Sequence, residues 1–313
     1  MGATFEEIKK SSPHIKSKNT TTQIMIDVLL ALMPALFAGL YFFGENAAKI
    51  VLISVVVSVV TELLFNLITK KPITITDFSA VVTGLLFALT LPANTPIYAV
   101  VLGAFVAIFV GKMLFGGIGK NFANPALVGR LFVVISFGSL LSAFIDPIDG
   151  IAGATPLVAI NAGDLSSINL LNLFLGSTGG CIGETSTLAL LLGGIYLSAK
   201  RIIDIRIPLI FLGGSAVLAF AFSGSINFVL PHLMAGGLML GAIFMATDYT
   251  TSPISDLSIV IYALGCAILT MVIRFFGSQP EGVSYAILLM NLLVPLLDKY
   301  VRPNPYGRGA KNE

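Results

Sequence analysis

Long apolar stretches separated by short polar segments run along nearly the whole chain. A transmembrane helix needs about 20 apolar residues, and ten stretches approach or reach that length. The pattern therefore predicts an all-α integral membrane protein with about ten transmembrane helices. The predicted spans are residues 24–43, 47–69, 78–91, 97–115, 125–144, 185–199, 207–222, 230–246, 257–276 and 283–297.

The predicted spans fall into two groups of five. A weak internal similarity relates residues 80–89 to 234–243 and residues 112–117 to 274–278. Because five is an odd number, the second group is inverted relative to the first, as in many transporters and channels. We therefore expect two inverted five-helix repeats in a urea-transporter-like fold, with chance similarity between apolar segments as the alternative. The predicted regions are a cytoplasmic segment (1–23), the first repeat (24–144), an external connection (145–183), the second repeat (184–298) and a cytoplasmic tail (299–313).

Lysine and arginine residues set the expected orientation, because they concentrate on the cytoplasmic side of membrane proteins. With the N-terminus inside, only Lys49 and Arg274 fall outside. The connection 145–183 holds no lysine or arginine, so we expect it to be external, and Thr155 with it. The residues assigned to the inside are Lys9, Lys10, Lys16, Lys18, Lys70, Lys71, Lys112, Lys120, Arg130, Lys200, Arg201, Arg206, Lys299, Arg302, Arg308 and Lys311.

Composition agrees with a membrane protein and narrows the function classes. Hydrophobic residues make up 56% of the chain and charged residues 11%, against about 25% charged residues in soluble domains. The net charge of +2 gives no reason to invoke nucleic acid. The polar residues 1–23 lack a hydrophobic signal core, so we expect no cleaved targeting peptide. Cys181 and Cys266 are far apart, which argues against a zinc or iron–sulfur site built by this chain alone.

The stretch Asp149 to Pro156 places one hydroxyl after a run of small residues. Gly150, Gly153 and Ala154 remove side-chain bulk before Thr155. Pro156 disfavours a helical conformation at the residue before it. We therefore expect Thr155 on an exposed turn, with its oxygen accessible as an acceptor for a covalently attached group. An ordinary small-residue turn is the structural alternative.

Two further stretches combine glycine or asparagine with charge. Four glycines between 176 and 183 precede Glu184 and Thr185, and Thr185 or Ser186 is a candidate cap for the next helix. Backbone amides at such a start can face an anion, and glycine lets a flat ring approach closely; a tight external turn is the alternative. Asn124 is expected to cap the span at 125. Arg130 lies about one turn further in, and we expect it to snorkel to the inner surface or to pair with a carboxylate or phosphate.

Three carboxylates are candidates for an ion path. Glu62 lies roughly 10 Å inside its predicted helix, where a carboxylate needs a partner, a proton or an ion. Asp248 sits among hydroxyl side chains that would suit a hard cation such as Na⁺, or it caps a loop. Asp27 is the weaker candidate, because it lies close enough to the cytoplasm to be a solvated charge at a helix start.

Together these stretches resemble the RnfD family, membrane subunits of the Rnf complex that are related to NqrB of the Na⁺-translocating NADH:quinone reductase. Gly153-Ala154-Thr155 matches the end of the motif onto which flavin transferases load FMN, although Ala152 stands where the family usually has serine or threonine. At Tyr249 the related reductase protein has proline. The other matching stretches are residues 11–15, 120–130, 183–187 and 245–248.

The resemblance implies a membrane flavoprotein subunit that relays electrons between ferredoxin and NAD⁺, coupled to Na⁺ or H⁺ translocation. It implies FMN attached to Thr155 by a phosphoester, with Asp149, Gly153, Ala154, Gly183, Glu184 and Thr185 around it. A second flavin such as riboflavin is compatible with it, at no identified site. The implied partners are the other subunits of a six-subunit assembly in the prokaryotic cell membrane, especially the other covalent-FMN subunit, and membrane lipid.

Two other function classes stay open at this point. The inverted repeat is also compatible with a solute channel of the urea-transporter type, which needs no acceptor threonine. A scaffold subunit without a cofactor is the third possibility. A covalent flavin detected on this chain would separate the first class from the other two.

Overall fold

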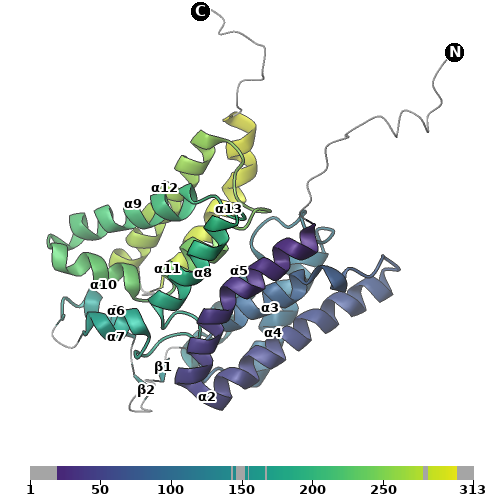
Figure 1. Cartoon of the computed structure of the whole chain (residues 1–313), viewed down its shortest axis with the longest axis horizontal. Coiled ribbons are helices and arrows are strands. Elements are labelled where there is room, and N and C mark those ends of the chain that lie inside the picture. Colours follow the sequence, from purple (N-terminus) through teal and green to yellow (C-terminus); the bar gives the residue numbers. More distant parts are fainter. Residues whose placement is uncertain are drawn as a thin grey trace, which may run out of the picture.

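The computed structural model describes residues 20–141, 144–145, 152–153, 155–165, 168–277 and 281–301. Within these ranges the chain is mostly helical (Figure 1). Two-residue strands β1 (Phe144–Ile145) and β2 (Ala152–Gly153) pair in antiparallel register. The α-helices are α2 (Thr21–Ile68), α3 (Ser79–Leu89), α4 (Ile97–Ile108), α5 (Pro125–Phe137), α6 (Pro156–Asn161), α7 (Leu170–Leu175), α8 (Thr187–Ala199), α9 (Arg206–Ser223), α10 (Val229–Met234), α11 (Leu238–Leu240), α12 (Asp256–Phe276) and α13 (Val283–Tyr300). Shorter 3₁₀ turns are η1 (Ile75–Asp77), η3 (Gly138–Leu140) and η4 (Ile226–Phe228), and π-helical turns are η2 (Phe109–Met113) and η5 (Gly241–Met245).

Four of the described helices, α2, α9, α12 and α13, are long and apolar enough to cross a membrane. A fifth crossing results if the pair Ile226–Met234 and Leu238–Met245, bent by 68°, counts as one broken span. α3, α5, α8 and the continuous α4–η2 helix are apolar but shorter. A mostly helical membrane protein is therefore confirmed, whereas ten spans in an inverted repeat stay a prediction.

The first two predicted spans form one element, α2, which is bent at Gly44. Gly44 has φ 60° and ψ −137°, a conformation that only glycine adopts readily. The helix runs down one side of the molecule, turns and runs back (Figure 1). Pro34 also lies within α2, but the non-helical residue inside this element is Gly44.

One predicted boundary needs correction, and one predicted helix cap is confirmed. The fifth span was predicted to reach residue 144, but α5 ends at Phe137 and a 3₁₀ turn follows. Gly138 explains this end, because glycine is a weak helix former. Ser186, one of the two predicted caps of the sixth helix, is the N-cap of α8 and accepts a hydrogen bond from the Ala189 amide at 3.3 Å.

The glycine-rich stretch before α8 packs inside the protein, against the end of α3. The Gly183 amide donates to the Leu89 carbonyl at 2.8 Å, and the Ile182 amide donates to the Leu91 carbonyl at 2.9 Å. A Cβ on Gly183 would lie 2.5 Å from the Cβ of Leu89, so no larger residue fits without displacing the backbone. The stretch is therefore a turn buried against α3, and its position on the external side stays a prediction.

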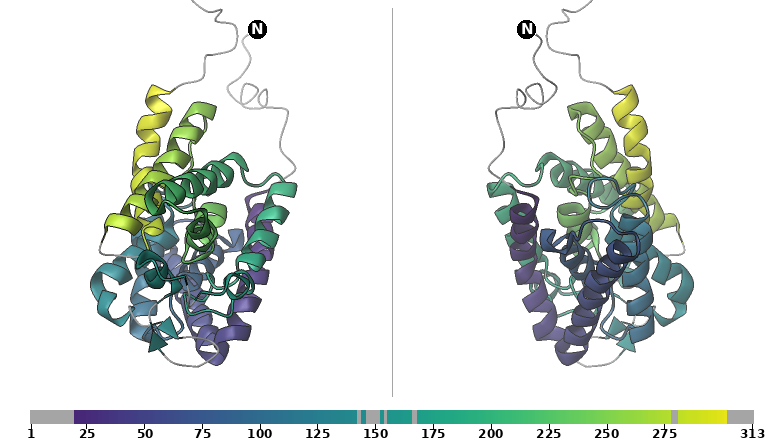
Figure 2. Two further views of the ribbon diagram at one scale, coloured as in Figure 1. Left: turned by 90° about the vertical axis from the view of Figure 1, so that its left-hand side faces the viewer. Right: turned by 90° about the vertical axis from the view of Figure 1, so that its right-hand side faces the viewer.

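Loops that were assigned to the inner surface gather at one end of the molecule. The Thr22 hydroxyl donates to the Thr76 carbonyl at 3.5 Å, and Lys200 lies 3.6 Å from Asp27. The start of α2 and the end of α13 lie at this end, and the bend of α2 and strands β1 and β2 lie at the other (Figures 1 and 2). The assignment of this end to the cytoplasm stays a prediction.

Candidate functional site

A buried ion cluster lies where several helices are interrupted. Its members come from α5, from the loop before α8, from α12 and from the segment before α13. The loop between α10 and α11 closes one side, because a Cβ on Gly237 would lie 2.5 Å from Oε1 of Glu184. Sites at such helix breaks are typical of transport proteins. The ion cluster consists of Arg130, Cys181, Glu184, Arg274 and Glu281.

Arg130 connects three members of the ion cluster. Its guanidinium forms a close ion pair with Glu281, lies 3.9 Å from Glu184 Oε1 and donates to Cys181 Sγ at 3.6 Å. The side chains of Arg130 and Glu184 are 7% and 4% exposed. The preferred expectation that Arg130 snorkels to the inner surface is therefore wrong. The guanidinium has carboxylate partners inside the protein, and pairing there compensates its desolvation.

Arg274 contributes a second guanidinium, held mainly by backbone. Its Nη1 donates to the His232 carbonyl at 2.6 Å and its Nη2 to the Ala235 carbonyl at 3.1 Å. Arg274 was expected on the outside, but it is buried. These carbonyls lie at the end of α10, where a helix leaves acceptors unpaired. Arg274 therefore satisfies the broken helix end and adds positive charge beside the carboxylates.

Glu184 is the least compensated carboxylate of the ion cluster. It lies in the loop before α8, outside the helices. Burial and the neighbouring Glu281 raise its pKa to about 8, because both disfavour the charged form. The surroundings of Glu184 therefore favour the protonated form of its carboxyl group.

Cys181, Glu184 and Glu281 also have the ligand types of a metal site. Their Sγ and carboxylate oxygens lie within 4.8 Å of one another. The guanidinium of Arg130 lies against all three, and its charge opposes a further cation. Sequence reasoning missed this grouping, because Glu281 is 100 residues from Cys181 and no local motif connects them.

Thr155 is the N-cap of α6, but its hydroxyl is buried. The residue is 4% exposed, and Oγ1 has no hydrogen-bond partner among the described residues. The expectation of an exposed, accessible hydroxyl is therefore wrong. The reason lies in α6, whose Leu157 and Ile160 pack against Leu173 and Ala235 and bring the preceding residue inside.

The neighbours of Thr155 in the predicted motif differ in their surroundings. Gly153 is exposed and pairs with Phe144 in the β1–β2 ladder. Asp149 and Ala154 lie outside the described residues. Thr185, predicted near the same group, is 4% exposed, and its Oγ1 also lacks a partner among the described residues.

Helix α6 connects Thr155 to the ion cluster. The Asn161 side chain donates to the Arg274 carbonyl at 3.1 Å. A Cβ on Gly236 would lie 3.2 Å from both Leu157 Cδ2 and Arg274 Nη2, so α6 and Arg274 meet at the same helix break. Leu157 of α6, Arg274 and Glu184 therefore all lie against the Gly236–Gly237 backbone.

Glu62 has a buried partner that the sequence reasoning did not assign to it. Lys112 Nζ lies 2.8 Å from Glu62 Oε2, and the two side chains are 4% and 0% exposed. The Thr74 hydroxyl donates to Glu62 Oε1 at 2.5 Å, and Lys112 also donates to Ser79 Oγ at 2.5 Å. Lys112 was assigned to the inner surface, but the π-helical turn η2 places it inside.

The two other acidic candidates have different environments. Asp248 accepts hydrogen bonds from the Thr250 amide and hydroxyl and from the Thr251 hydroxyl, at 3.0–3.3 Å. Burial raises the pKa of Asp248. Asp27 accepts from the Tyr196 hydroxyl at 2.7 Å and pairs with Lys200, which is 53% exposed. Asp27 is therefore a partly solvated surface charge, and Asp248 caps a turn.

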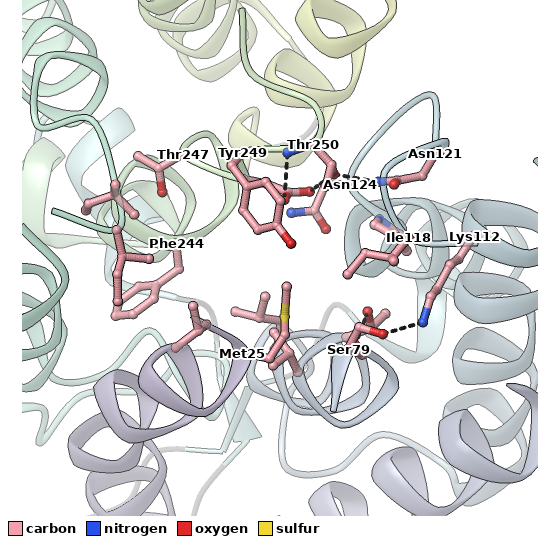
Figure 3. Close-up of a pocket in the computed structure, with 18 of the residues that line it drawn as sticks. Met25, Ser79, Lys112, Ile118, Asn121, Asn124, Phe244, Thr247, Tyr249 and Thr250 are labelled. Atoms are coloured by element: carbon pink, nitrogen blue, oxygen red, sulfur yellow. Dashed lines mark hydrogen bonds between the residues drawn. The ribbon is translucent and has the colours of Figure 1, made fainter. Parts of the chain in front are cut away.

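A central pocket, part of it open to solvent, lies between α2, α3 and the loops that follow η2, α8 and η5 (Figure 3). Asn121, Asn124 and Thr250 line one side of the opening, and Met25 and Ser79 lie across from them (Figure 3). Asp248 and Lys112, the partner of Glu62, also line this pocket. Two of the three acidic candidates are therefore connected to one cavity.

Comparison with known proteins gives consistent matches over nearly the whole chain. Residues 8–307 match the NQR2, RnfD, RnfE family. The chain is 47% identical over 302 residues to the D subunit of the Na(+)-translocating ferredoxin:NAD(+) oxidoreductase complex of Acetobacterium woodii, covering 95% of this chain and 94% of the relative. It is 40% identical over 316 residues to the D subunit of the proton-translocating ferredoxin:NAD(+) oxidoreductase complex of Clostridium ljungdahlii, covering 95% of each.

Proposed function

Because the chain belongs to the NQR2, RnfD, RnfE family, we propose that it is the RnfD-type membrane subunit of an ion-translocating ferredoxin:NAD⁺ oxidoreductase complex. Relatives 47% and 40% identical over nearly their full length are named as such subunits, which supports an oxidoreductase subunit over a solute channel. One relative is named for Na⁺ and the other for protons, so the names leave the ion open. The other subunits of such a complex are the expected partners.

We propose that this subunit carries FMN on Thr155. The observation that supports this is the buried Oγ1 of Thr155, which has no hydrogen-bond partner in the described part of the chain. A buried hydroxyl without a partner costs stability, so replacing its hydrogen by a phosphoryl group breaks no internal bond. Gly153 has no side chain that would fill the space before Thr155. Gly183, Glu184 and Thr185 lie on the loop before α8, which reaches the ion cluster beside α6. Bound FMN would supply one-electron transfer, and the protein supplies its position and electrostatic surroundings.

Burial of Thr155 has a consequence for the loading of the group. A transferase has to reach Oγ1, which α6 holds inside through Leu157 and Ile160. We therefore expect attachment to precede or to displace the packing of α6 on Leu173 and Ala235. In the cell membrane, strands β1 and β2 would face outward, at the end opposite the loops assigned to the cytoplasm.

The direct test is a denaturing gel of the purified complex, viewed under ultraviolet light. We expect a fluorescent band at the mass of this subunit, and peptide mass mapping should place FMN on the peptide that contains Thr155. A non-fluorescent subunit with an unmodified Thr155 peptide would leave a scaffold without a cofactor as the better interpretation.

We propose the central pocket as the site of the second, non-covalent flavin. Asn121, Asn124 and Thr250 provide amide and hydroxyl groups that suit the polar edge of a flavin ring, and Leu86 and Phe244 provide apolar surface. Pockets of this kind combine an apolar wall with a few polar groups. The same pocket contains Lys112 and Asp248, so a flavin here would lie beside the proposed ion path through Glu62.

Replacement of Val28 by phenylalanine should reduce the binding of this second flavin at least about tenfold. Val28 lines the central pocket, and a ring in its place occupies the volume that a ligand needs. The measurement is the amount of flavin released by denaturation, compared with the covalent fluorescence of the band. The matched control is Val56→Phe, on an exposed face of the same helix. Equal release from both variants would place the second flavin elsewhere.

A further inference from the structure

Two carboxylates of the ion cluster compete for one guanidinium. Arg130 forms a close pair with Glu281, whereas Glu184 lies 3.9 Å away. Arg274 donates its hydrogen bonds to the backbone carbonyls of His232 and Ala235. It therefore lends the carboxylates positive charge but no hydrogen bond from these two donors. The arrangement satisfies one carboxylate well and the other poorly.

The poorly satisfied carboxylate is enclosed. Glu184 Oε2 and Glu281 Oε1 are buried and have no hydrogen-bond partner among the described residues. The Gly237 backbone lies so close to Glu184 Oε1 that a Cβ would contact it. A buried ionised oxygen without a donor is strongly unfavourable, and two adjacent carboxylates disfavour simultaneous ionisation. Protonation removes one negative charge and adds a donor.

We propose that Glu184 and Glu281 form a proton-binding site in which Glu184 holds one exchangeable proton. Binding converts the Glu184 carboxylate and one H⁺ from water into a carboxylic acid, with no redox change. The groups that face Glu184 from the surrounding elements are Arg130 on α5, Cys181 on its own loop, Arg274 on α12 and Glu281 before α13.

Because Glu184 lies near α6, the proton that it binds can respond to the proposed electron relay. This role rests on the proposed function. α6, which begins directly after Thr155, contacts the helix break beside Arg274. Negative charge arriving near Thr155 would favour protonation of Glu184, and its removal would favour release, because charges interact strongly in a buried site. Proton occupancy at Glu184 would thus follow the charge on the flavin.

Infrared pH-difference spectra of the purified complex, in H₂O and in D₂O, test the site without any redox step. We expect a carboxylic-acid C=O band that shifts in D₂O and disappears as the pH rises through about 8. Glu184→Gln should remove this band, while Glu45→Gln should not. Glu45 is the matched control because it pairs with Lys49 and its side chain is 80% exposed.

Glu281→Gln keeps the proposal testable if Glu184→Gln does not assemble. Without the Glu281 charge, Arg130 is free to pair with Glu184. The loss of the neighbouring negative charge and the new ion pair both favour the ionised form of Glu184. The band should then titrate at least about one pH unit lower. A band that persists in Glu184→Gln, or an unchanged midpoint in Glu281→Gln, would overturn the assignment.

Two further measurements separate the possible failures. Addition of Na⁺ at constant pH should leave the band unchanged, and its loss on adding Na⁺ would indicate a cation site instead. Redox-difference spectra should show the same band only when the flavin is present. A complex without covalent flavin but with the pH-dependent band would contradict the proposed function and leave the proton site standing.

Discussion

Replacement of Thr155 by valine is expected to abolish covalent flavin on this subunit while its abundance in the membrane stays close to that of the wild type. Valine has the shape of threonine but no oxygen to esterify, so the fluorescent band should be lost completely. The fold should tolerate the change, because Oγ1 has no hydrogen-bond partner among the described residues. Removing a buried hydroxyl without a partner is neutral or stabilising, whereas breaking a hydrogen bond costs about 1–3 kcal/mol.

The chain offers a closely matched control for this experiment. Thr185 is also 4% exposed, and its Oγ1 is likewise buried without a described partner. Thr185→Val should keep the fluorescent band even if Thr185 lies near the flavin, because the phosphoester needs only the oxygen of Thr155. Thr155→Ser retains a hydroxyl and should keep at least part of it. Covalent flavin that remains in Thr155→Val would show that another residue is the acceptor.

Glu62→Gln should destabilise the subunit by about 3–5 kcal/mol, because it leaves Lys112 buried and unpaired. The pair lies at 2.8 Å with both side chains almost fully buried. Thermal unfolding in detergent and abundance in the membrane measure the effect. Glu45→Gln, which breaks an exposed pair with Lys49, should cost less than about 1 kcal/mol.

The double variant Glu62→Gln with Lys112→Gln separates structure from transport. Removing both charges leaves no unpaired ion, so the double variant should recover most of the lost stability. Ion transport in vesicles is then measured at equal abundance. Transport that stays low identifies Glu62 or Lys112 as part of the ion path, and full transport shows that the pair is structural only.

Local signals predicted several elements correctly. Asn124 caps α5 by accepting from the Ala126 amide at 3.0 Å, and Pro125 follows at the first helical position. The predicted span 257–276 agrees with α12 within one residue. These features depend on neighbouring residues, so hydropathy and capping patterns are sufficient to find them.

The main contacts of the candidate site could not be predicted in this way. Arg130 and Glu281 are 151 residues apart, and Lys112 and Glu62 are 50 residues apart. Such pairs leave no periodic pattern, because only the folded chain brings them together. Thr155 was predicted to be exposed from its small neighbours, but the packing of Leu157 and Ile160 decided its burial. The distribution of lysine and arginine residues likewise predicted Lys112 at the inner surface, although it pairs with the buried carboxylate of Glu62.

The π-helical turn η2 has a consequence for how the pair of Lys112 and Glu62 is aligned. A π-turn closes its hydrogen bonds over five residues, where an α-turn uses four, and acts as a one-residue insertion within a helix. Each residue of an α-helix turns the chain by about 100°. Without that insertion, the Lys112 side chain would leave the α4–η2 helix in a different direction around the helix axis. The ion pair between Lys112 and Glu62 thus depends on the number of residues in the α4–η2 helix as much as on the presence of a lysine at position 112.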